Sequence, residues 1–264
     1  MRGAVMKMRK INITGDVHGY QDSLEEIVGT MERGDILIVA GDFGFGMFDD
    51  VSRSEKSFFD EINEKGVIIL FCDGNHENFD ELNALPVSEW CGGKVHKVRD
   101  NIMHLMRGEV YEIDGERIFV FGGGFSADLG INPFRVPGVA YWKEEMPSEE
   151  EYANGRRKLV KTGYRIDHII THTLPEDTLS ALRGFKDLPE ERPLRYYLQH
   201  DVFDMLADTK RFIKEPKYKF WYFGHVHIDE ELWRRQYALF KYVRDLRTGA
   251  IVYTRTKHVD KTHL

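Results

Sequence analysis

The sequence predicts an α/β fold, and three observations support that prediction. The first third of the chain alternates short apolar runs with amphipathic segments of helical spacing. Polar clusters punctuated by glycine follow several of these runs. The chain has 264 residues and 42% of them are hydrophobic, which is enough for a substantial core. A single α/β domain of this size is common, so we expect one domain over residues 1–264.

The N-terminal third predicts a βαβαβ unit. Strands are expected at Lys10–Thr14, Ile36–Ala40 and Val67–Cys72, with helices at Asp22–Met31 and Ser52–Glu64 between them. Such units pair their strands in parallel through right-handed crossovers. The carboxyl ends of parallel strands meet at one edge of the sheet, where open α/β sheets bind ligands.

The middle of the chain has a different pattern. Four short antiparallel strands joined by tight turns are expected at Gly93–Val98, Ile102–Met106, Glu109–Ile113 and Arg117–Gly122. An irregular, lid-like segment follows at about residues 125–147. A loop of this length inside a compact domain is usually functional or mobile.

The C-terminal half returns to helices and strands. A helix capped by Ser148 is expected over Ser148–Lys161, and an amphipathic helix over Arg195–Ala207. The expected strands lie at Arg165–Thr171, Tyr218–Phe223, Tyr237–Val243 and Ala250–Thr254.

Composition excludes several classes of protein. The formal net charge of -7 gives no sign of a basic nucleic-acid groove. No apolar stretch approaches the roughly 18 residues of a membrane helix, so no membrane association is expected. The two cysteines, Cys72 and Cys91, argue against a disulfide framework, and Cys72 is expected to be a buried thiol. No apolar run follows the basic start, so no signal peptide is expected and we predict a cytoplasmic protein.

Five polar motifs carry the chemistry. They are Gly15-Asp16-Val17-His18-Gly19, Gly41-Asp42, Gly74-Asn75-His76-Glu77, Thr171-His172-Thr173 and Gly224-His225-Val226-His227. Taken singly they are weak signals: Asp16 and His18 could form a turn, Asn75 alone is more often a turn residue than a ligand, and one of His225 and His227 could be a core histidine. Together they supply the carboxylates, amide and imidazoles that a two-metal hydrolytic site needs.

The ordered set resembles the calcineurin-like metallophosphoesterase superfamily, whose pattern runs D-x-H, G-D, G-N-H-E/D, H, G-H-x-H. The resemblance extends from Lys10 to about Tyr253. It implies a four-layer α/β fold, in which a two-sheet β-sandwich is flanked by helices. It also implies a dinuclear metal centre on loops at one edge.

The resemblance also implies the ligand sets. The first ion would be held by Asp16, His18, Asp42 and His227, and the second by Asp42, Asn75, His172 and His225. Asp42 would bridge the two ions, and a bridging carboxylate offsets the repulsion between them. The mixed nitrogen and oxygen set suits two divalent ions such as Mn, Fe, Zn, Ni or Co. The remaining histidines are expected to be structural or at the surface: His96, His104, His168, His200, His258 and His263.

His76 is the expected catalytic residue. The resemblance makes it an acid or transition-state stabiliser near the leaving-group oxygen. The implied mechanism is in-line attack on phosphorus by a metal-bridging hydroxide. Glu77 either orients His76 or a ligand, or is an ordinary turn carboxylate.

The second motif departs from the pattern of phosphoprotein phosphatases, G-D-x-x-D-R. The run Gly41–Gly46 lacks the second Asp and the phosphate-clamping Arg. Its aromatic residues Phe43 and Phe45, with Phe48 nearby, either form an apolar wall beside the metals or pack inward, and inward packing is the expectation.

The stretch after Phe121 resembles a small bacterial and phage-borne subgroup that reads G-G-A-x-S-x-D-K and then R, G, W-W and E. Leu129 replaces its Lys and Tyr141 its first Trp. Three substrate contacts are predicted here: Ser126, Asp128 and Arg135. A guanidinium matches phosphate oxygens, although Arg135 reads equally well as an exposed loop residue.

These observations predict a dinuclear metal-dependent phosphoesterase acting on a small phosphomonoester or phosphodiester, nucleotide-like or otherwise. One alternative is a Ser/Thr-type protein phosphatase, which the missing Asp and Arg disfavour. The other is a non-catalytic scaffold with the same fold. Scaffold relatives have lost ligands, whereas this chain retains the full set.

Overall fold

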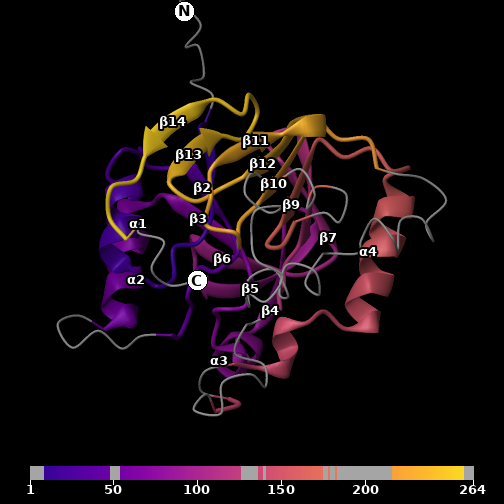
Figure 1. The fold of residues 1–264 in the computed structure, drawn as a ribbon. Helices are drawn as coiled ribbons and strands as arrows, with labels where there is room; N and C mark the ends of the chain where they lie inside the picture. The colour runs from indigo at the N-terminus through magenta and orange to yellow at the C-terminus, as the bar shows by residue number, and fades with distance from the viewer. Residues whose placement is uncertain are drawn as a thin grey trace, which may run out of the picture.

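The protein forms two β-sheets packed face to face with helices on their outer faces (Figure 1). We describe the fold from a computed structural model. The structure describes residues 9–47, 54–125, 136–138, 141–174, 178, 182 and 216–258.

The first sheet has eight strands in the order β14-β13-β1-β2-β3-β6-β5-β4. Its centre, β1-β2-β3-β6, is parallel, and the outer strands on both sides are antiparallel. The bounds are β1 (Ile11–Thr14), β2 (Ile36–Ala40), β3 (Ile68–Cys72), β4 (Val87–Trp90), β5 (Gly93–Arg99), β6 (Ile102–Leu105), β13 (Tyr242–Asp245) and β14 (Ile251–Thr254).

The second sheet repeats this plan with six strands in the order β11-β12-β10-β9-β8-β7. Its centre, β12-β10-β9-β8, is parallel, and β11 and β7 are antiparallel edges. The bounds are β7 (Glu109–Ile113), β8 (Glu116–Phe121), β9 (His168–Thr171), β10 (Phe220–Phe223), β11 (Glu230–Leu232) and β12 (Gln236–Ala238).

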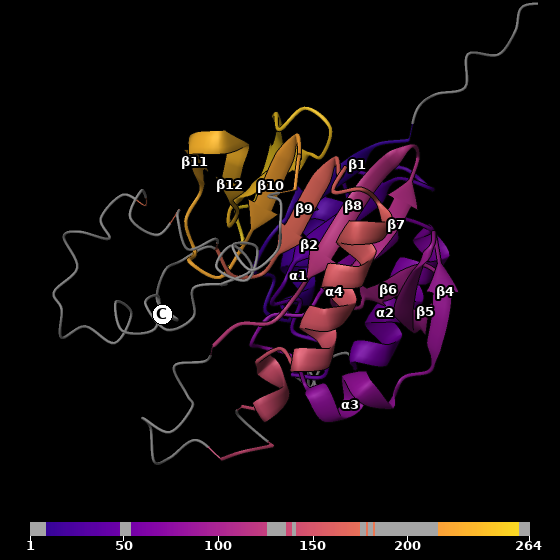
Figure 2. The same ribbon diagram turned by 90° about the vertical axis from the view of Figure 1, so that its right-hand side faces the viewer.

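Helices α1 (Gln21–Val28) and α2 (Glu55–Lys65) cover the first sheet, and α4 (Glu149–Lys161) lies against the second (Figure 2). Ser148 caps α4 in a capping box with Glu151. Short elements are α3 (Phe79–Ala84) and the 3-10 turns η1 (Lys143–Glu145) and η2 (Trp233–Arg235). Within the described part of the chain, every helix is too short or too polar to cross a membrane.

Side-chain alternation along the strands builds the layers. In β2, Leu37 and Val39 face the cluster under α1 and α2, whereas Ile36 and Ile38 face the core between the sheets. All four are fully buried. A strand buried on both faces reads as a continuous apolar run, which is why this pattern predicted a parallel strand correctly.

The expected α/β fold and the N-terminal βαβαβ unit are confirmed. The four middle strands pair antiparallel as expected, β5 with β6 and β7 with β8, but the two pairs do not lie in one sheet. Strands β5 and β6 belong to the first sheet and β7 and β8 to the second, and β6 pairs with β3 in parallel. Helix α3 and strand β4 were not predicted. The helix expected over Arg195–Ala207 lies outside the described residues.

The buried His168 on β9 predicts a pH-dependent stability. Burial lowers the pKa of His168 to about 4, although the neighbouring carboxylates of Glu116 and Asp167 raise it. The unfolded chain binds this proton below its ordinary pKa of 6.5, but the folded protein does not. The free energy of unfolding should therefore fall, on the order of 1–3 kcal/mol, as pH drops from 6.5 towards 4.

Urea titration of the metal-free protein at pH 7 and pH 4.5 measures this effect. His168→Gln should lose less stability than wild type over the same interval, because Gln does not titrate. Equal losses in both proteins would refute the assignment.

Candidate metal centre

The carboxyl ends of five parallel strands bring the predicted ligands to one place. Asp16 follows β1, Asp42 follows β2 and Asn75 follows β3, while His172 and His225 follow β9 and β10 of the other sheet. The two sheets therefore each supply part of the site. Their parallel centres point their strand ends to the same edge of the molecule.

One group of ligand atoms comes from Asp16, His18, Asp42 and His227, whose atoms all lie within 4.8 Å of one another. His18 Nε2 lies 2.9 Å from His227 Nε2 and 3.7 Å from Asp42 Oδ2. His227 Nε2 lies 3.7 Å from Asp16 Oδ1. This is the set that the resemblance assigned to the first ion.

A second group surrounds His172 Nε2. It lies 3.1 Å from Asn75 Oδ1, 3.2 Å from His225 Nδ1 and 3.3 Å from Asp42 Oδ1. His225 Nδ1 is also 3.1 Å from Asn75 Oδ1. This is the set assigned to the second ion, and Asp42 again belongs to it.

The chemistry of these donors fits divalent metal ions. His172 Nδ1 lies 3.1 Å from the carbonyl of Ala40 and donates to it, so Nε2 presents its lone pair to the cluster in the neutral ring. Asn75 Oδ1, His225 Nδ1 and Asp42 Oδ1 all lie within 3.3 Å of that nitrogen. Asp16 Oδ2 is buried and has no hydrogen-bond partner among the described residues. A cation shared by these atoms would satisfy them.

Burial and mutual charge shift the acidities of the metal-free site. Burial raises the pKa of Asp16 to about 7, with the charge of Asp42 adding to the effect. Burial also raises the pKa of Asp42, but His172 and His76 outweigh it and hold that pKa well below its usual range. The pKa of His172 rises to about 10 because Asp42 outweighs its burial. Metal binding at neutral pH should therefore release protons from Asp16 and His172.

The imidazoles of His18 and His227 are neutral in the metal-free site. Burial lowers the pKa of His18 to about 3 and that of His227 to about 4. A neutral ring is the form that binds a metal ion.

The backbone is strained at the site. Five of the predicted ligands adopt the left-handed conformation: Asp16, His18, Asp42, His225 and His227, at φ values of 51°, 53°, 49°, 69° and 48°. Strain of this kind persists only where the surrounding structure enforces it, and it concentrates at functional sites.

Two of the motif glycines are required by close packing. A Cβ on Gly41, at φ 80°, would lie 2.1 Å from His172 Nδ1. A Cβ on Gly74 would lie 2.1 Å from Asp42 Oδ1. Both glycines therefore allow the loops to approach the ligands.

Glu77 stabilises the loops that carry Asp42 and Asn75. It is fully buried, and its carboxylate accepts backbone N–H groups of Phe43, Gly44 and Phe45 after β2 and of Gly74 after β3. Burial, with the charge of Asp42, raises its pKa. Of the roles left open for Glu77, the structure supports a loop-binding role rather than a contact with His76.

Glu77→Gln should lower the free energy of unfolding by about 1–3 kcal/mol, because an amide NH2 then faces backbone N–H donors in a buried site. Thermal or urea unfolding measures the loss. The exposed Glu81→Gln is the control and should have little effect. Unchanged stability of Glu77→Gln would show that these hydrogen bonds contribute little.

A buried ionic network supports the third motif from behind. Arg107 donates from Nε to Asp73 Oδ2 at 2.8 Å and also binds the carbonyl of Glu144. His104 Nε2 lies 2.9 Å from Asp73 Oδ1 and its Nδ1 lies 3.1 Å from His96 Nδ1. Burial raises the pKa of Asp73, but Arg107 and His104 hold it well below its usual range.

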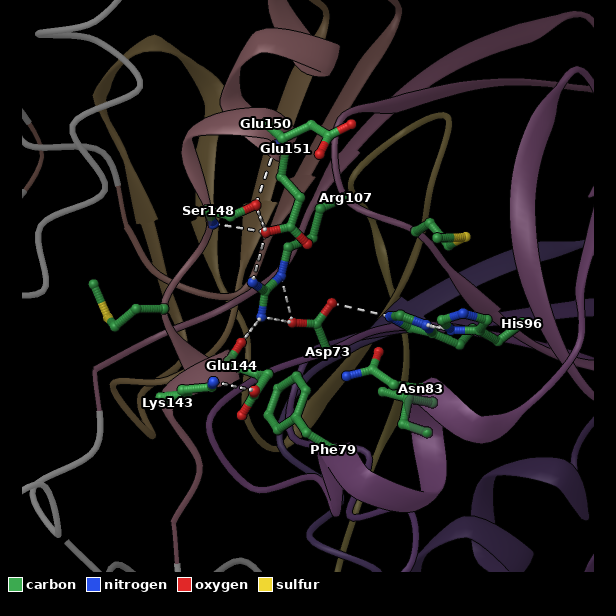
Figure 3. Close-up of a pocket in the computed structure, with 14 residues that line it drawn as sticks. Asp73, Phe79, Asn83, His96, Arg107, Lys143, Glu144, Ser148, Glu150 and Glu151 are labelled. Carbon is green, nitrogen blue, oxygen red and sulfur yellow. Dashed lines mark hydrogen bonds and ion pairs between the residues drawn. The ribbon is translucent and has the colours of Figure 1, made fainter. Parts of the chain in front are cut away.

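Figure 3 shows this network lining a pocket of about 510 Å³ between α3, η1 and the start of α4. Arg107 lies between the carboxylates of Asp73 and Glu151, and none of the predicted metal ligands lines the pocket. Sequence analysis identified neither Asp73 nor Arg107. The only signal was an acidic residue directly before Gly74, which needs a cation when buried.

The other predicted site residues divide as follows. His76 lies on the loop beside the first group, and its ring centroid is 5.1 Å from that of His18. Phe43 and Phe45 pack inward, in the core against Phe59 and Phe71, as expected. Phe48 and all three predicted substrate contacts, Ser126, Asp128 and Arg135, lie outside the described residues.

The fold and the cluster together define a class of protein: a two-sheet α/β protein with a candidate His/Asp/Asn metal centre at the strand ends. The chain belongs to the family described as calcineurin-like phosphoesterases, because the sequence model of that family matches residues 9–229.

Two further comparisons show what the chain is similar to. The chain is 25% identical over 204 residues to a lariat debranching enzyme of Schizosaccharomyces pombe (strain 972 / ATCC 24843), a match that covers 73% of this chain. The match spans only 36% of that relative's length. The crystal structure of TT1561 of Thermus thermophilus shares the fold, with a TM-score of 0.50 and 16% identity, over 93% of this chain and 97% of that one.

Proposed function

We propose that the protein is a dinuclear metal-dependent phosphoesterase that hydrolyses a small phosphomonoester or phosphodiester. The observation that carries the proposal is the pair of ligand groups that share Asp42. A single carboxylate in contact with both groups is what a two-ion site needs. The family match supports hydrolysis of phosphate esters as the reaction.

Each residue has a definite task in this proposal. Asp16, His18 and His227 would hold one divalent ion, Asn75, His172 and His225 the other, and Asp42 both. Ions such as Mn²⁺, Fe²⁺, Zn²⁺, Ni²⁺ or Co²⁺ suit this donor set. Bound there, the ions supply Lewis acidity towards the phosphoryl oxygens and make a water molecule more acidic.

His76 would protonate the leaving-group oxygen or stabilise the charge that develops on it. Its backbone N–H donates to Asp42 Oδ1 at 2.9 Å, which places residue 76 beside the bridging carboxylate. Its side chain is half-buried, so a substrate can reach it. General-acid assistance of this kind typically contributes about 10²–10⁴-fold.

A lariat phosphodiester is a second candidate substrate. The match to a lariat debranching enzyme favours it, although that match spans little more than a third of the relative. The formal net charge of -7 gives no sign of a basic nucleic-acid groove and favours a small ester instead.

Metal loading and a substrate screen test the proposal. The metal-free protein is titrated with Mn²⁺, and aryl and alkyl phosphate monoesters, diesters and a lariat are then assayed with Mn²⁺, Ni²⁺ and Zn²⁺. Two ions per chain and metal-dependent hydrolysis are expected. Saturation at one ion, or no hydrolysis of any ester despite two ions, would overturn it. The latter result would favour a scaffold.

Arg135 is proposed to contact the substrate phosphate, with Ser126 and Asp128 on the same pocket wall. The chain enters this segment beside the cluster, since a Cβ on Gly124 would lie 3.0 Å from the His172 ring. The phosphate-clamping Arg of protein phosphatases is missing from the second motif. A phosphate dianion still requires a cation or backbone donors besides the ions.

Arg135→Ala should lower kcat/KM by about 10- to 100-fold, the usual loss for a hydrogen bond to a charged group, and leave metal content unchanged. Arg135→Lys should retain only part of the wild-type kcat/KM, because the point charge of lysine cannot reproduce the bidentate geometry of a guanidinium. Steady-state kinetics and metal analysis measure both effects. Wild-type kcat/KM in Arg135→Ala would remove the proposed contact.

A further inference from the structure

Arg255 is a buried arginine that lies outside the motifs and beyond residue 229, where the family match ends. Its side chain is 1% exposed. Its Nη1 donates to the backbone carbonyls of Gly15 at 2.6 Å and Phe240 at 2.9 Å, and its Nη2 to that of Asp16 at 3.1 Å. Burial lowers its pKa to about 10, so it is still charged at neutral pH. A buried cation is thus attached directly to the loop of the first motif.

Phe240 connects Arg255 to a second ligand. Its ring stacks on that of His227, with centroids 4.7 Å apart and an interplanar angle of 5°. The carboxylate of Asp229 accepts the N–H groups of Phe240, Lys241 and Tyr242 at 2.8–3.0 Å. The turn that carries Phe240 is therefore held by Asp229 at its N–H groups and by Arg255 at its carbonyl.

The segment that carries Arg255 is itself attached to α1. Glu26 accepts hydrogen bonds from the Thr256 hydroxyl at 2.6 Å, from the Tyr253 hydroxyl at 2.9 Å and from the N–H groups of Thr256 and Lys257 at 3.0 and 3.2 Å. Burial raises the pKa of Glu26, but these hydrogen bonds outweigh it and lower the pKa to about 2. Arg255 is consequently a fixed support rather than a mobile side chain.

The direct contacts of Arg255 and Phe240 with ligand residues involve only one of the two ligand groups. Asp16 and His227 belong to the group with His18 and Asp42. Among the described residues, the hydrogen bonds of Arg255 include none to His172, Asn75 or His225. Those residues are held by Ala40, by Asp42 and by one another, and the backbone N–H of His225 also donates to Asp16 Oδ1 at 2.9 Å.

We propose that Arg255 is a positioning residue that selectively supports the metal position formed by Asp16, His18, Asp42 and His227. The inference rests on the proposed dinuclear centre. Asp16 and His227 adopt left-handed backbone conformations, at φ values of 51° and 48°. Strained conformations of this kind persist only where the surrounding structure enforces them. Arg255 fixes the carbonyls on both sides of the Asp16 backbone and, through Phe240, the ring plane of His227.

Calorimetric titration of the metal-free protein with Mn²⁺ tests this proposal, together with electron paramagnetic resonance, which distinguishes a coupled ion pair from a single ion. Arg255→Met should lower the affinity for one of the two ions by about 10- to 100-fold and leave the affinity for the other unchanged. A loss of this size is usual when a residue that supports a metal ligand is removed. Arg255→Lys should recover part of the affinity.

Arg244→Met is the matched control. Arg244 is a buried arginine that donates to the carbonyl of Gly249 and lies 4.7 Å from the centre of the Tyr237 ring, away from the ligands. Arg244→Met should lower the stability of the protein but leave its affinity for each of the two Mn²⁺ ions unchanged. Phe240→Leu is the second variant and should weaken the same ion as Arg255→Met, which keeps the test decisive if Arg255→Met does not fold.

The inference would be overturned if Arg255→Met bound both ions with wild-type affinity. If Arg255→Met does not fold, the same result in Phe240→Leu would overturn it. Equal weakening of both ions, or the same selective loss in Arg244→Met, would also overturn it. A wild-type protein that binds no Mn²⁺ would overturn both this inference and the proposed function. A wild-type protein that binds two ions but hydrolyses no ester would overturn only the function, because every outcome for Arg255 is measured by metal binding.

Discussion

Asp42→Asn should reduce phosphoesterase activity by roughly 10³-fold or more, because it removes the one negative charge that both ligand groups share. Asn retains an oxygen that can still accept the N–H groups of Asn75 and His76, each 2.9 Å from Asp42 Oδ1. The loop should therefore stay in place while the two ions lose their shared counter-charge. Steady-state kinetics and metal analysis after Mn²⁺ loading measure the two effects separately.

Asp245→Asn provides the matched control. Asp245 is also an aspartate that accepts backbone N–H groups, those of Arg247 and Thr248, but it lies at the end of β13, just before the turn to β14. The Asp245→Asn variant should have the activity and metal content of the wild-type protein. An Asp42→Asn variant that binds two ions and retains activity within about tenfold would contradict the bridging role.

His76→Ala should lose about 10²–10⁴-fold in turnover and keep its metal ions, since His76 is assigned no bond to either ion. The loss should be smaller for an aryl ester than for an alkyl ester, because an aryl oxide leaves without needing a proton. Kinetics on the two esters, with metal analysis of the same preparations, measure the difference.

His168→Gln is the control for His76, because it changes a buried histidine that faces Glu116 and Phe220 rather than the cluster. It should hydrolyse both esters at the wild-type rate. Equal losses on the two esters in His76→Ala would argue against proton donation, and loss of an ion would assign His76 to the metal shell.

Much of the fold could be predicted because its signals are local. The apolar run Ile36–Ala40 and the helical spacing from Asp22 to Met31 each lie within a few residues. The assignment of β5–β8 to two sheets was not predicted, because hydrophobic alternation shows that a residue is buried but not against which strand. Short elements such as α3, with six residues, carry too weak a period to be recognised.

The sequence by itself determined the residue types of the candidate site and their order, because each predicted ligand follows an apolar strand within a few positions. It also determined the family, since the motif pattern depends on those same short segments.

Only the tertiary structure decided which residues support the ligands. Glu77 binds N–H groups of a loop more than thirty positions away, and Arg255 binds the carbonyl of Asp16 from 239 positions further along the chain. Asp73 follows β3 and Arg107 follows β6, and the two side chains meet because these strands are neighbours in the first sheet. Contacts of this kind depend on which strands pair, and no local property of the sequence encodes that pairing.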